Sequence, residues 1–300
     1  MPSAYRRLRR RYYFGLTRLV LGAARALPRS TGRAAGRALA RLALAIRPAE
    51  RRQAVANLAL ALPHDSDAAR VRRLRRATDL LGENLFDALT VDRRLEDPRG
   101  GVEGQEALAR LAALRAEGRG VLVLTGHLGC WELLGGWLAR TQGGLTVVVG
   151  EIRNPPVDRL VNDRRRALGL TPVPRAGDLR PLLRTLRTGG VAAVLMDQAT
   201  RVPSRPVPFF GRPAPTATGF AGLALRTGAP VLPLGIARRG EGHEVIVGET
   251  IRPGADRSEA AEDALLARCN AALEDLVRRN PEEWVWFHRR WPESASLGEA

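Results

Sequence analysis

The sequence predicts an α/β fold, a mixed sheet covered by helices, with an N-terminal segment of amphipathic helices. From residue 104 onward, short apolar runs alternate with helical patterns, as expected when helices connect the strands of a sheet. Before that point the chain shows only helical periodicity, and it is rich in arginine. We therefore expect membrane-associating basic helices over residues 1–65 and an α/β core over residues 66–300.

The spacing of apolar residues places the individual elements. Helical patterns cover about residues 6–27, 33–46 and 67–90, with a short helix between Arg51 and Pro63. Pro48 is expected to end the second of these helices. Candidate strands lie at 121–125, 145–149, 191–196, 230–236 and 244–248. Further helices are expected at 105–117, 131–140, 156–168, 178–188, 217–227 and 258–279.

The composition limits the class of protein. Three hundred residues that are 45% hydrophobic can bury one sizeable core. The formal net charge of +17 indicates an anionic partner, which could be nucleic acid, an anionic membrane surface or a phosphorylated substrate. Cys130, Cys269 and the four histidines are scattered, so neither a disulfide framework nor a metal site is expected.

The N-terminal helix has the composition of one that lies in a membrane interface. Residues 6–11 include five arginines, an aromatic cluster follows at residues 12–14, and Arg11, Arg18 and Arg25 recur every seven residues. No run of about 20 uncharged apolar residues exists, so we expect peripheral attachment to an anionic membrane surface rather than a span. The alternative is a solvated helix packed on the core.

The strongest chemical signal is His127 followed by Glu132, where the strand at 121–125 turns into a helix. An imidazole base and an orienting carboxylate suffice to activate a hydroxyl for attack on an acyl group. The two side chains can meet only if His127 lies in the turn and Glu132 in the first helical turn, because residues five apart on one helix point about 140° apart. Gly126 and Gly129 give the turn its backbone freedom. The alternative is a buried structural histidine.

Other candidates follow the later strands. Arg153 comes after the strand at 145–149, where α/β sheets bind ligands, whereas Arg159 and Arg165 are expected on a solvated helix face. Asp197 ends the strand at 191–196, and the apolar loop at 206–210 is expected to line a pocket or enter lipid. Cys130, three residues after His127, offers a less favoured thiol nucleophile.

Four motifs in this order resemble the bacterial lipid A biosynthesis acyltransferases, within the wider glycerolipid acyltransferase group. The motifs are Arg51-Arg52 with Asn57-Leu58; Gly126-His127 with Glu132; Pro208-Phe209-Phe210-Gly211 continuing through Pro213-Ala214, Thr216, Thr218-Gly219 and Thr227-Gly228-Ala229-Pro230-Val231; and Pro281-Glu282-Glu283-Trp284 with Trp286 and His288-Arg289-Arg290. The resemblance covers about residues 15–291.

The resemblance implies transfer of a fatty acyl chain from an acyl carrier protein or coenzyme A thioester to a hydroxyl of a phosphorylated glycolipid. His127 would be the general base, and Glu132 would hold its tautomer. Gly126, Arg153, Arg166 and Asp197 are the candidate substrate-binding residues. No cofactor, metal or covalent acyl-enzyme is implied.

The resemblance also implies a location at the cytoplasmic face of the bacterial inner membrane. The acceptor is expected to be a lipid A precursor, with phosphatidylinositol mannoside or another lysolipid as the alternative. A non-catalytic basic protein that binds membrane or nucleic acid is the rival class. Recognisable nucleic-acid-binding motifs are missing from the sequence, so no nucleic acid partner is expected.

Overall fold

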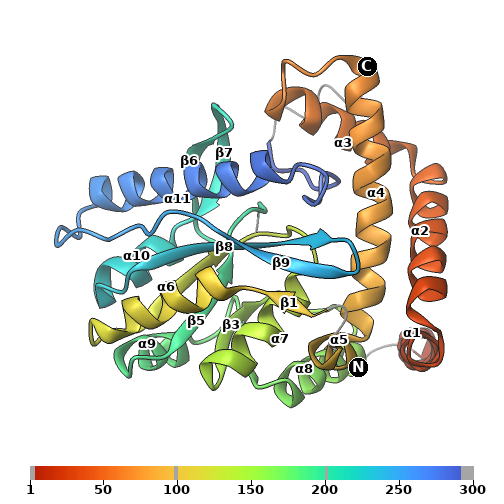
Figure 1. Ribbon diagram of the computed structural model, residues 1–300, viewed down its shortest axis with the longest axis horizontal. Helices are drawn as coiled ribbons and strands as arrows, with labels where there is room; N and C mark the ends of the chain where they lie inside the picture. The colour runs from red at the N-terminus through yellow and green to blue at the C-terminus, as the bar shows by residue number, and fades with distance from the viewer. Residues whose placement is uncertain (1–3, 98–100, 200–201, 292–300) are drawn as a thin grey trace.

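The computed structural model describes residues 4–97, 101–199 and 202–291. Its centre is a seven-stranded mixed sheet with helices on both faces, and further N-terminal helices stand beside the sheet, at the right of Figure 1. The α/β fold class predicted from the sequence is confirmed. The division near residue 65 stays a prediction.

The strands of the main sheet run in the order β1-β9-β8-β2-β5-β3-β4. Their bounds are β1 Val102–Glu103, β2 Val121–Thr125, β3 Leu145–Val149, β4 Leu170–Pro174, β5 Val191–Leu195, β8 Val231–Arg239 and β9 Gly242–Val247. Strand β2 pairs in parallel with β5 and β8, β3 pairs in parallel with β4 and β5, and β9 is antiparallel to β8. The carboxyl ends of β2, β3, β4, β5 and β8 therefore meet at one edge of the sheet.

The sequence analysis did not predict the strands that are rich in proline. Edge strand β4 contains Pro172 and Pro174, and an edge strand tolerates the missing N–H donors. The hairpin of β6 (Ser204–Phe209) and β7 (Arg212–Ala217) also alternates prolines with other residues. The prediction that the loop at 206–210 lines a pocket or enters lipid is wrong, because these residues belong to the hairpin and Phe209 and Phe210 are buried against Trp291.

Two layers of helices bury the sheet. Helices α6 (Gln105–Ala116) and α7 (Trp131–Gln142) share one hydrophobic cluster with Val121 and Val123 of β2. Helices α9 (Arg180–Arg187), α10 (Gly219–Thr227) and α11 (Glu259–Arg279) share the other cluster with Leu122 and Leu124. Successive β2 side chains thus point to opposite faces, both buried, which explains the uninterrupted apolar run in the sequence.

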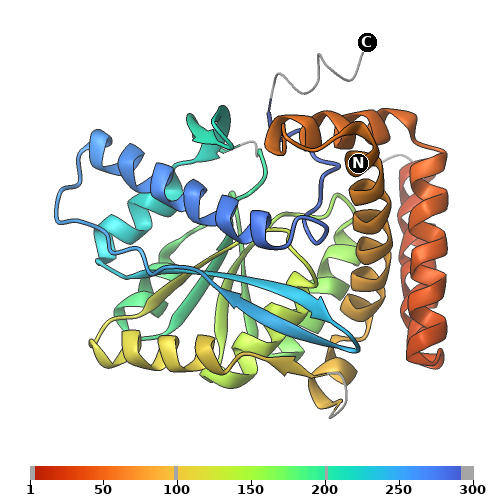
Figure 2. The same cartoon turned by 45° about the horizontal axis from the view of Figure 1, so that its top comes forward.

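The remaining helices form the N-terminal layer and the rim of the sheet. They are α1 Ala4–Ala26, α2 Arg29–Ala45, α3 Pro48–Ala61, α4 Asp67–Leu89, α5 Val91–Glu96 and α8 Pro155–Ala167. Pro48 starts α3 as well as following α2, because proline is tolerated in the first helical turn, where an N–H has no helical partner. Figure 2 shows α2 lying along α4, on the side away from the sheet, whereas α1 is seen end-on in Figure 1 and so crosses the direction of both helices.

Helices α2 and α4 touch through glycine. A Cβ added to Gly36 would lie 2.3 Å from the carbonyl oxygen of Gly82, and a Cβ on Gly82 would lie 2.3 Å from the carbonyl oxygen of Gly36. The two backbones therefore approach more closely than any larger residue allows.

Buried charges tie this helical layer to the sheet. The fully buried Asp87 of α4 accepts hydrogen bonds from Arg33 of α2 at 2.9 Å and from Arg238 of β8 at 2.8 Å. Burial by itself would raise the pKa of Asp87, but the two arginines hold it below its usual value. Beside them, burial and the charge of Arg238 lower the pKa of His243 to about 3, so this imidazole is neutral. Removing one partner of such a group leaves an uncompensated buried charge, which lowers the free energy of unfolding by about 3–5 kcal/mol.

We expect Gly82→Ala to lower the free energy of unfolding by about 1–3 kcal/mol, because the methyl group would separate α2 from α4. The matched control is Gly22→Ala in α1, where an added Cβ meets nothing within 4 Å. There the change should stabilise the protein by about 0.5–1 kcal/mol through helix propensity. Urea unfolding of both variants measures the difference, and equal gains in stability would contradict the close crossing.

Candidate active site

His127 lies in the turn between the central strand β2 and helix α7, as the sequence predicted. The turn needs glycine at position 129, where φ is +62° and an added Cβ would lie 1.9 Å from the carbonyl oxygen of Ile236. Glu132 occupies the first turn of α7, also as predicted.

The carboxylate that contacts His127 is Asp197, which lies two residues after the end of β5. Strands β2 and β5 are neighbours in register, with Thr125 opposite Leu195, so their carboxyl ends bring the two residues together. Asp197 Oδ1 lies 2.8 Å from His127 Nδ1, and Oδ2 accepts the backbone N–H of His127 at 2.7 Å. The aspartate is only 2% exposed.

These contacts set the protonation of the imidazole. Burial would raise the pKa of Asp197, but His127 and the indole N–H of Trp284 lower it to about 2. An ionised carboxylate only accepts hydrogen bonds, so Nδ1 of His127 carries the proton. Nε2 is then the basic nitrogen, and His127 lines a cavity.

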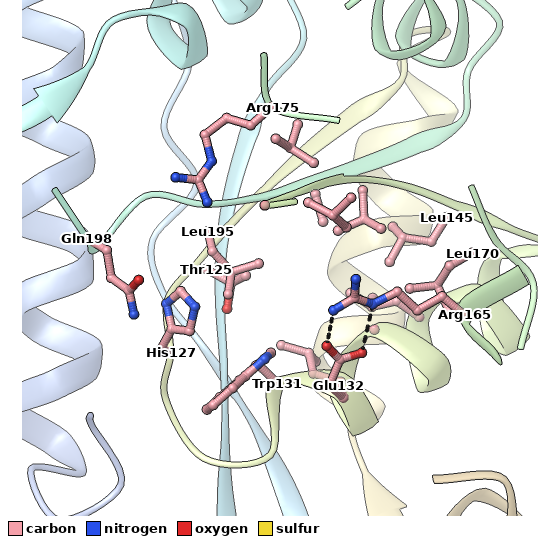
Figure 3. Close-up of a pocket in the computed structure, with 18 residues that line it drawn as sticks. Thr125, His127, Trp131, Glu132, Leu145, Arg165, Leu170, Arg175, Leu195 and Gln198 are labelled. Carbon is pink, nitrogen blue, oxygen red and sulfur yellow. Dashed lines mark hydrogen bonds and ion pairs between the residues drawn. The ribbon is translucent and has the colours of Figure 1, made fainter. Parts of the chain in front are cut away.

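The predicted role of Glu132 as the group that holds the His127 tautomer is wrong in this structure. Both Glu132 carboxylate oxygens accept hydrogen bonds from Arg165 of α8, as the dashed lines in Figure 3 show. The side chain of Trp131 stands between His127 and this ion pair, with its ring 5.0 Å from the imidazole centroid. Glu132 is the second residue of α7, and its side chain points toward α8 instead.

A cavity of about 120 Å³ joins these groups. Its polar rim is formed by Thr125, His127, Glu132, Arg165, Arg175 and Gln198. Apolar side chains of α7, β3, β4 and β5 complete it, among them Leu145 and Leu170, drawn to the right in Figure 3. The site thus combines one base, one ion pair and an apolar lining at the carboxyl edge of the sheet.

The other predicted substrate-binding residues lie away from this cavity. Arg153 is exposed in the loop before α8, and Arg166 forms an exposed ion pair with Asp163 at 2.7 Å, one turn back on the same helix. Gly126 lies against Asp197, where an added Cβ would come within 2.9 Å of the carboxylate carbon. Gly126 therefore makes room for Asp197, and Asp197 is itself buried behind His127 instead of facing the cavity.

Cys130 does not offer a nucleophile. Its side chain is 2% exposed, its thiol donates to the carbonyl of Asn84 at 3.4 Å, and burial raises the pKa of the thiol. The thiolate, which is the reactive form, is therefore disfavoured.

Two arginines in the cavity were missed by sequence reasoning. Arg165 was expected on a solvated face, and Arg175 was not singled out. The signal for Arg175 was its place directly after an apolar segment, but that segment was not recognised as strand β4. For Arg165, three consecutive arginines gave no means of choosing the inward one. Elsewhere, in the part of the chain that the structure describes, no three His, Cys, Asp or Glu side chains gather closely enough to hold a metal ion.

Comparison with known proteins agrees with this architecture. Residues 3–293 match the family model described as bacterial lipid A biosynthesis acyltransferase. A phosphatidylinositol mannoside acyltransferase of Mycobacterium tuberculosis (strain CDC 1551 / Oshkosh) is 27% identical over 188 residues, which is 61% of this chain and 58% of the relative. The enzyme of the same name from Mycolicibacterium smegmatis is 25% identical over 178 residues, 58% of this chain and 57% of the relative.

The chain therefore spans under three fifths of the length of these relatives, whereas the family model covers nearly all of it. The His127 turn, the strand-end Asp197 and the apolar cavity all lie within the region that the family model matches. The chain belongs to the bacterial lipid A biosynthesis acyltransferase family.

Proposed function

We propose that this protein transfers a fatty acyl chain from a thioester to a hydroxyl group of a glycolipid, with His127 as the general base. The observation that carries the proposal is the 2.8 Å contact between His127 Nδ1 and Asp197, which leaves the other ring nitrogen basic in a cavity with an apolar lining. Membership of an acyltransferase family supports the reaction class.

In the proposed reaction, Nε2 of His127 removes the proton from the acceptor hydroxyl as its oxygen attacks the thioester carbonyl. Asp197 stabilises the imidazolium that forms. The tetrahedral intermediate collapses with cleavage of the carbon–sulfur bond, and the imidazolium returns its proton to the departing thiolate. The buried Cys130 thiol is consistent with direct transfer without an acyl-enzyme.

The ion pair of Glu132 and Arg165 has a different part in this proposal. Because each neutralises the other, the pair presents hydrogen-bonding groups to the acceptor without a net charge. Arg175 is exposed at the rim and is the better placed cation for a phosphate of the donor or acceptor. Arg153 and Arg166 lie outside the cavity, which weakens their assignment as substrate contacts.

We assign the acyl chain to a second, larger cavity. It measures about 490 Å³ and lies beside α9 and α10, and it shares Val148, Arg175, Leu195 and Gln198 with the His127 cavity. Its wall is mostly apolar, with Leu182, Met196, Phe220 and Leu223. A methylene group is close in size to a water molecule, which occupies roughly 30 Å³ in the liquid, so this cavity is large enough for an alkyl chain of many carbons.

The donor is an acyl thioester of an acyl carrier protein or of coenzyme A, and the acceptor is a phosphorylated glycolipid. The description of the family favours a lipid A precursor, whereas the names of the mycobacterial relatives favour a phosphatidylinositol mannoside. Both carry a phosphate and free sugar hydroxyls, so one site chemistry suits either.

Helix α1 supports attachment to a membrane surface. Tyr5, Leu8, Tyr12, Leu16 and Leu19 recur every three or four residues and are 41–70% exposed. At about 100° per residue they fall within an arc of about 80°, which makes one apolar stripe. Arginines flank the stripe, and they suit anionic headgroups.

Helix α2 adds a second exposed apolar row, Leu39 and Leu42, which Ile46 continues just after the end of the helix. Among the residues that the structure describes, no helix is long and apolar enough to cross a membrane. We infer that α1 and α2 lie on the cytoplasmic face of the bacterial inner membrane, where the acceptor would be met.

The test of the function is lipid mass spectrometry on a bacterial host that lacks its own late acyltransferases. Expression of the wild type should yield a glycolipid heavier by one acyl chain. His127→Ala and Asp197→Asn should lower the rate by about 10²- to 10⁴-fold in a purified assay, because the base or its orienting carboxylate is lost. Cys130→Ser should keep most of the activity.

The same assay separates the candidates. Host lipids that contain either lipid A precursors or phosphatidylinositol mannosides distinguish the two acceptors, and acyl carrier protein and coenzyme A thioesters distinguish the donors. Acyl transfer at the wild-type rate by a folded His127→Ala protein would refute the role of His127 as the general base. Loss of transfer in Cys130→Ser would instead favour Cys130 as a thiol nucleophile.

Filling the larger cavity should shorten the preferred acyl chain. Ala217 lies in its wall, so Ala217→Phe should reduce transfer of a sixteen-carbon chain by about tenfold or more while keeping the rate with an eight-carbon chain. The short-chain rate serves as the internal control for folding. An equal loss of the transfer rate with both donors, or an unchanged rate with both, would show that the acyl chain does not bind in this cavity.

A charge placed in the apolar stripe of α1 should weaken membrane binding. We expect Leu8→Glu with Leu19→Glu to reduce flotation with vesicles that contain anionic lipid, and added salt to weaken the wild type. The matched control is Val71→Glu, which changes an equally apolar, 54% exposed residue of α4. If both proteins float like the wild type, α1 is not the anchor.

A further inference from the structure

The loop that carries His127 is paired with a segment close to the C-terminal end of the described chain. The backbone N–H of Gly129 donates to the carbonyl of Glu283 at 2.9 Å, and the N–H of Val285 donates to the carbonyl of His127 at 3.2 Å. Leu128 and Trp284 thus form a single antiparallel bridge. Residues 283–285 therefore pair with the irregular His127 turn as a short antiparallel strand would.

The side chain of Trp284 reaches the same site by a second route. Its indole N–H donates to Asp197 Oδ2 at 2.8 Å, on the carboxylate that contacts His127. The ring is 3% exposed and packs edge-on against Trp286, with centroids 4.6 Å apart, and near Phe209 at 5.8 Å. This packing fixes the direction of the N–H.

We propose that Trp284 is a positioning residue that sets how strongly the Asp197 carboxylate acts on the His127 imidazole. This rests on the proposed function of His127 as a base. The N–H of Trp284 takes up part of the negative charge on Oδ2, so that the carboxylate orients the imidazole without holding its proton too tightly. A base that must return its proton to the leaving thiolate needs this balance.

The anchoring of the segment is consistent with such a role. The Glu283 carboxylate accepts the backbone N–H of Arg238 at 2.7 Å and the side-chain amide of Asn84 at 2.8 Å. Asn57 of α3 donates to the carbonyls of Trp286 and His288. Trp284 is therefore held from both sides, and its N–H cannot turn away from Asp197.

Other groups also face His127. The ring of His288 lies 5.9 Å from it, the Trp131 ring lies 5.0 Å away, and the Glu132–Arg165 pair and Arg175 line the same cavity. The indole N–H of Trp284 donates to Asp197 and not to these groups, so a change at Trp284 acts on His127 through that carboxylate.

The experiment compares Trp284→Phe with Trp286→Phe. Both changes remove a buried indole N–H from the same segment, but that of Trp286 donates to the carbonyl of Pro281, away from Asp197. The protein is labelled with ¹⁵N-histidine and titrated by NMR, and the His127 signal is identified by its loss in His127→Ala. The pH dependence of kcat and KM is measured on the same samples.

In Trp284→Phe, the carboxylate keeps its charge but has one donor fewer, so the imidazolium is stabilised. We expect the titration of His127 to move up by about half a pH unit or more, and the acid limb of kcat to move with it. At neutral pH, kcat should fall by up to about threefold for a shift of half a pH unit, with KM little changed, since the loss concerns the base and not substrate binding. Trp286→Phe should leave both titration curves in place.

Identical titrations of His127 in the wild type and Trp284→Phe would overturn the proposal, as would an equal loss of kcat in both variants with no shift of the pH profile. If Trp284→Phe does not fold, replacement of Trp284 by β-(3-benzothienyl)alanine keeps the shape and removes only the N–H. A wild type without acyl transfer would count against the proposed function, whereas the NMR titration still decides the role of Trp284.

Discussion

The contact between His127 and Asp197 is the interaction on which the rest of the site depends. It joins the carboxyl ends of two neighbouring parallel strands, and a buried carboxylate is tolerated there only because three donors satisfy it. The close approach also explains the small residues around it. Gly126 leaves space for the carboxylate, and Gly129 lets the turn pass under Ile236.

From this contact a continuous set of polar interactions leads to the N-terminal helices. The turn is paired with Glu283, Glu283 accepts the backbone N–H of Arg238, and the Arg238 side chain meets Asp87 beside Arg33 of α2. The inner side of the helical layer is therefore joined to the core by buried charges. Its outer side presents apolar stripes on α1 and α2.

Several features of the fold were predictable because they depend on local sequence. The apolar run of β2, the glycine-bounded turn and the start of α7 follow from periodicity and backbone freedom. The prediction erred where local signals conflict with tertiary context. The proline-rich strand β4 and the β6–β7 hairpin were not predicted, because proline is unfavourable inside a sheet, yet strands at an edge accept it. The apolar residues at 209–210 were expected to line a pocket or enter lipid, but they pack against Trp291.

The sequence by itself determined that His127 stands at a strand end with Glu132 on the following helix, and that the chain carries the ordered motifs of an acyltransferase family. Only the tertiary structure decided which carboxylate forms a hydrogen bond with His127. Asp197 lies 70 residues away in the chain, yet it is a neighbour because β2 and β5 pair in register. The tertiary structure also determines that Arg165 and not Arg166 lines the cavity. Consecutive helical residues point about 100° apart, so only one of the two can face it. Sequence order records neighbours along the chain, whereas the contact between His127 and Asp197 is made across strands.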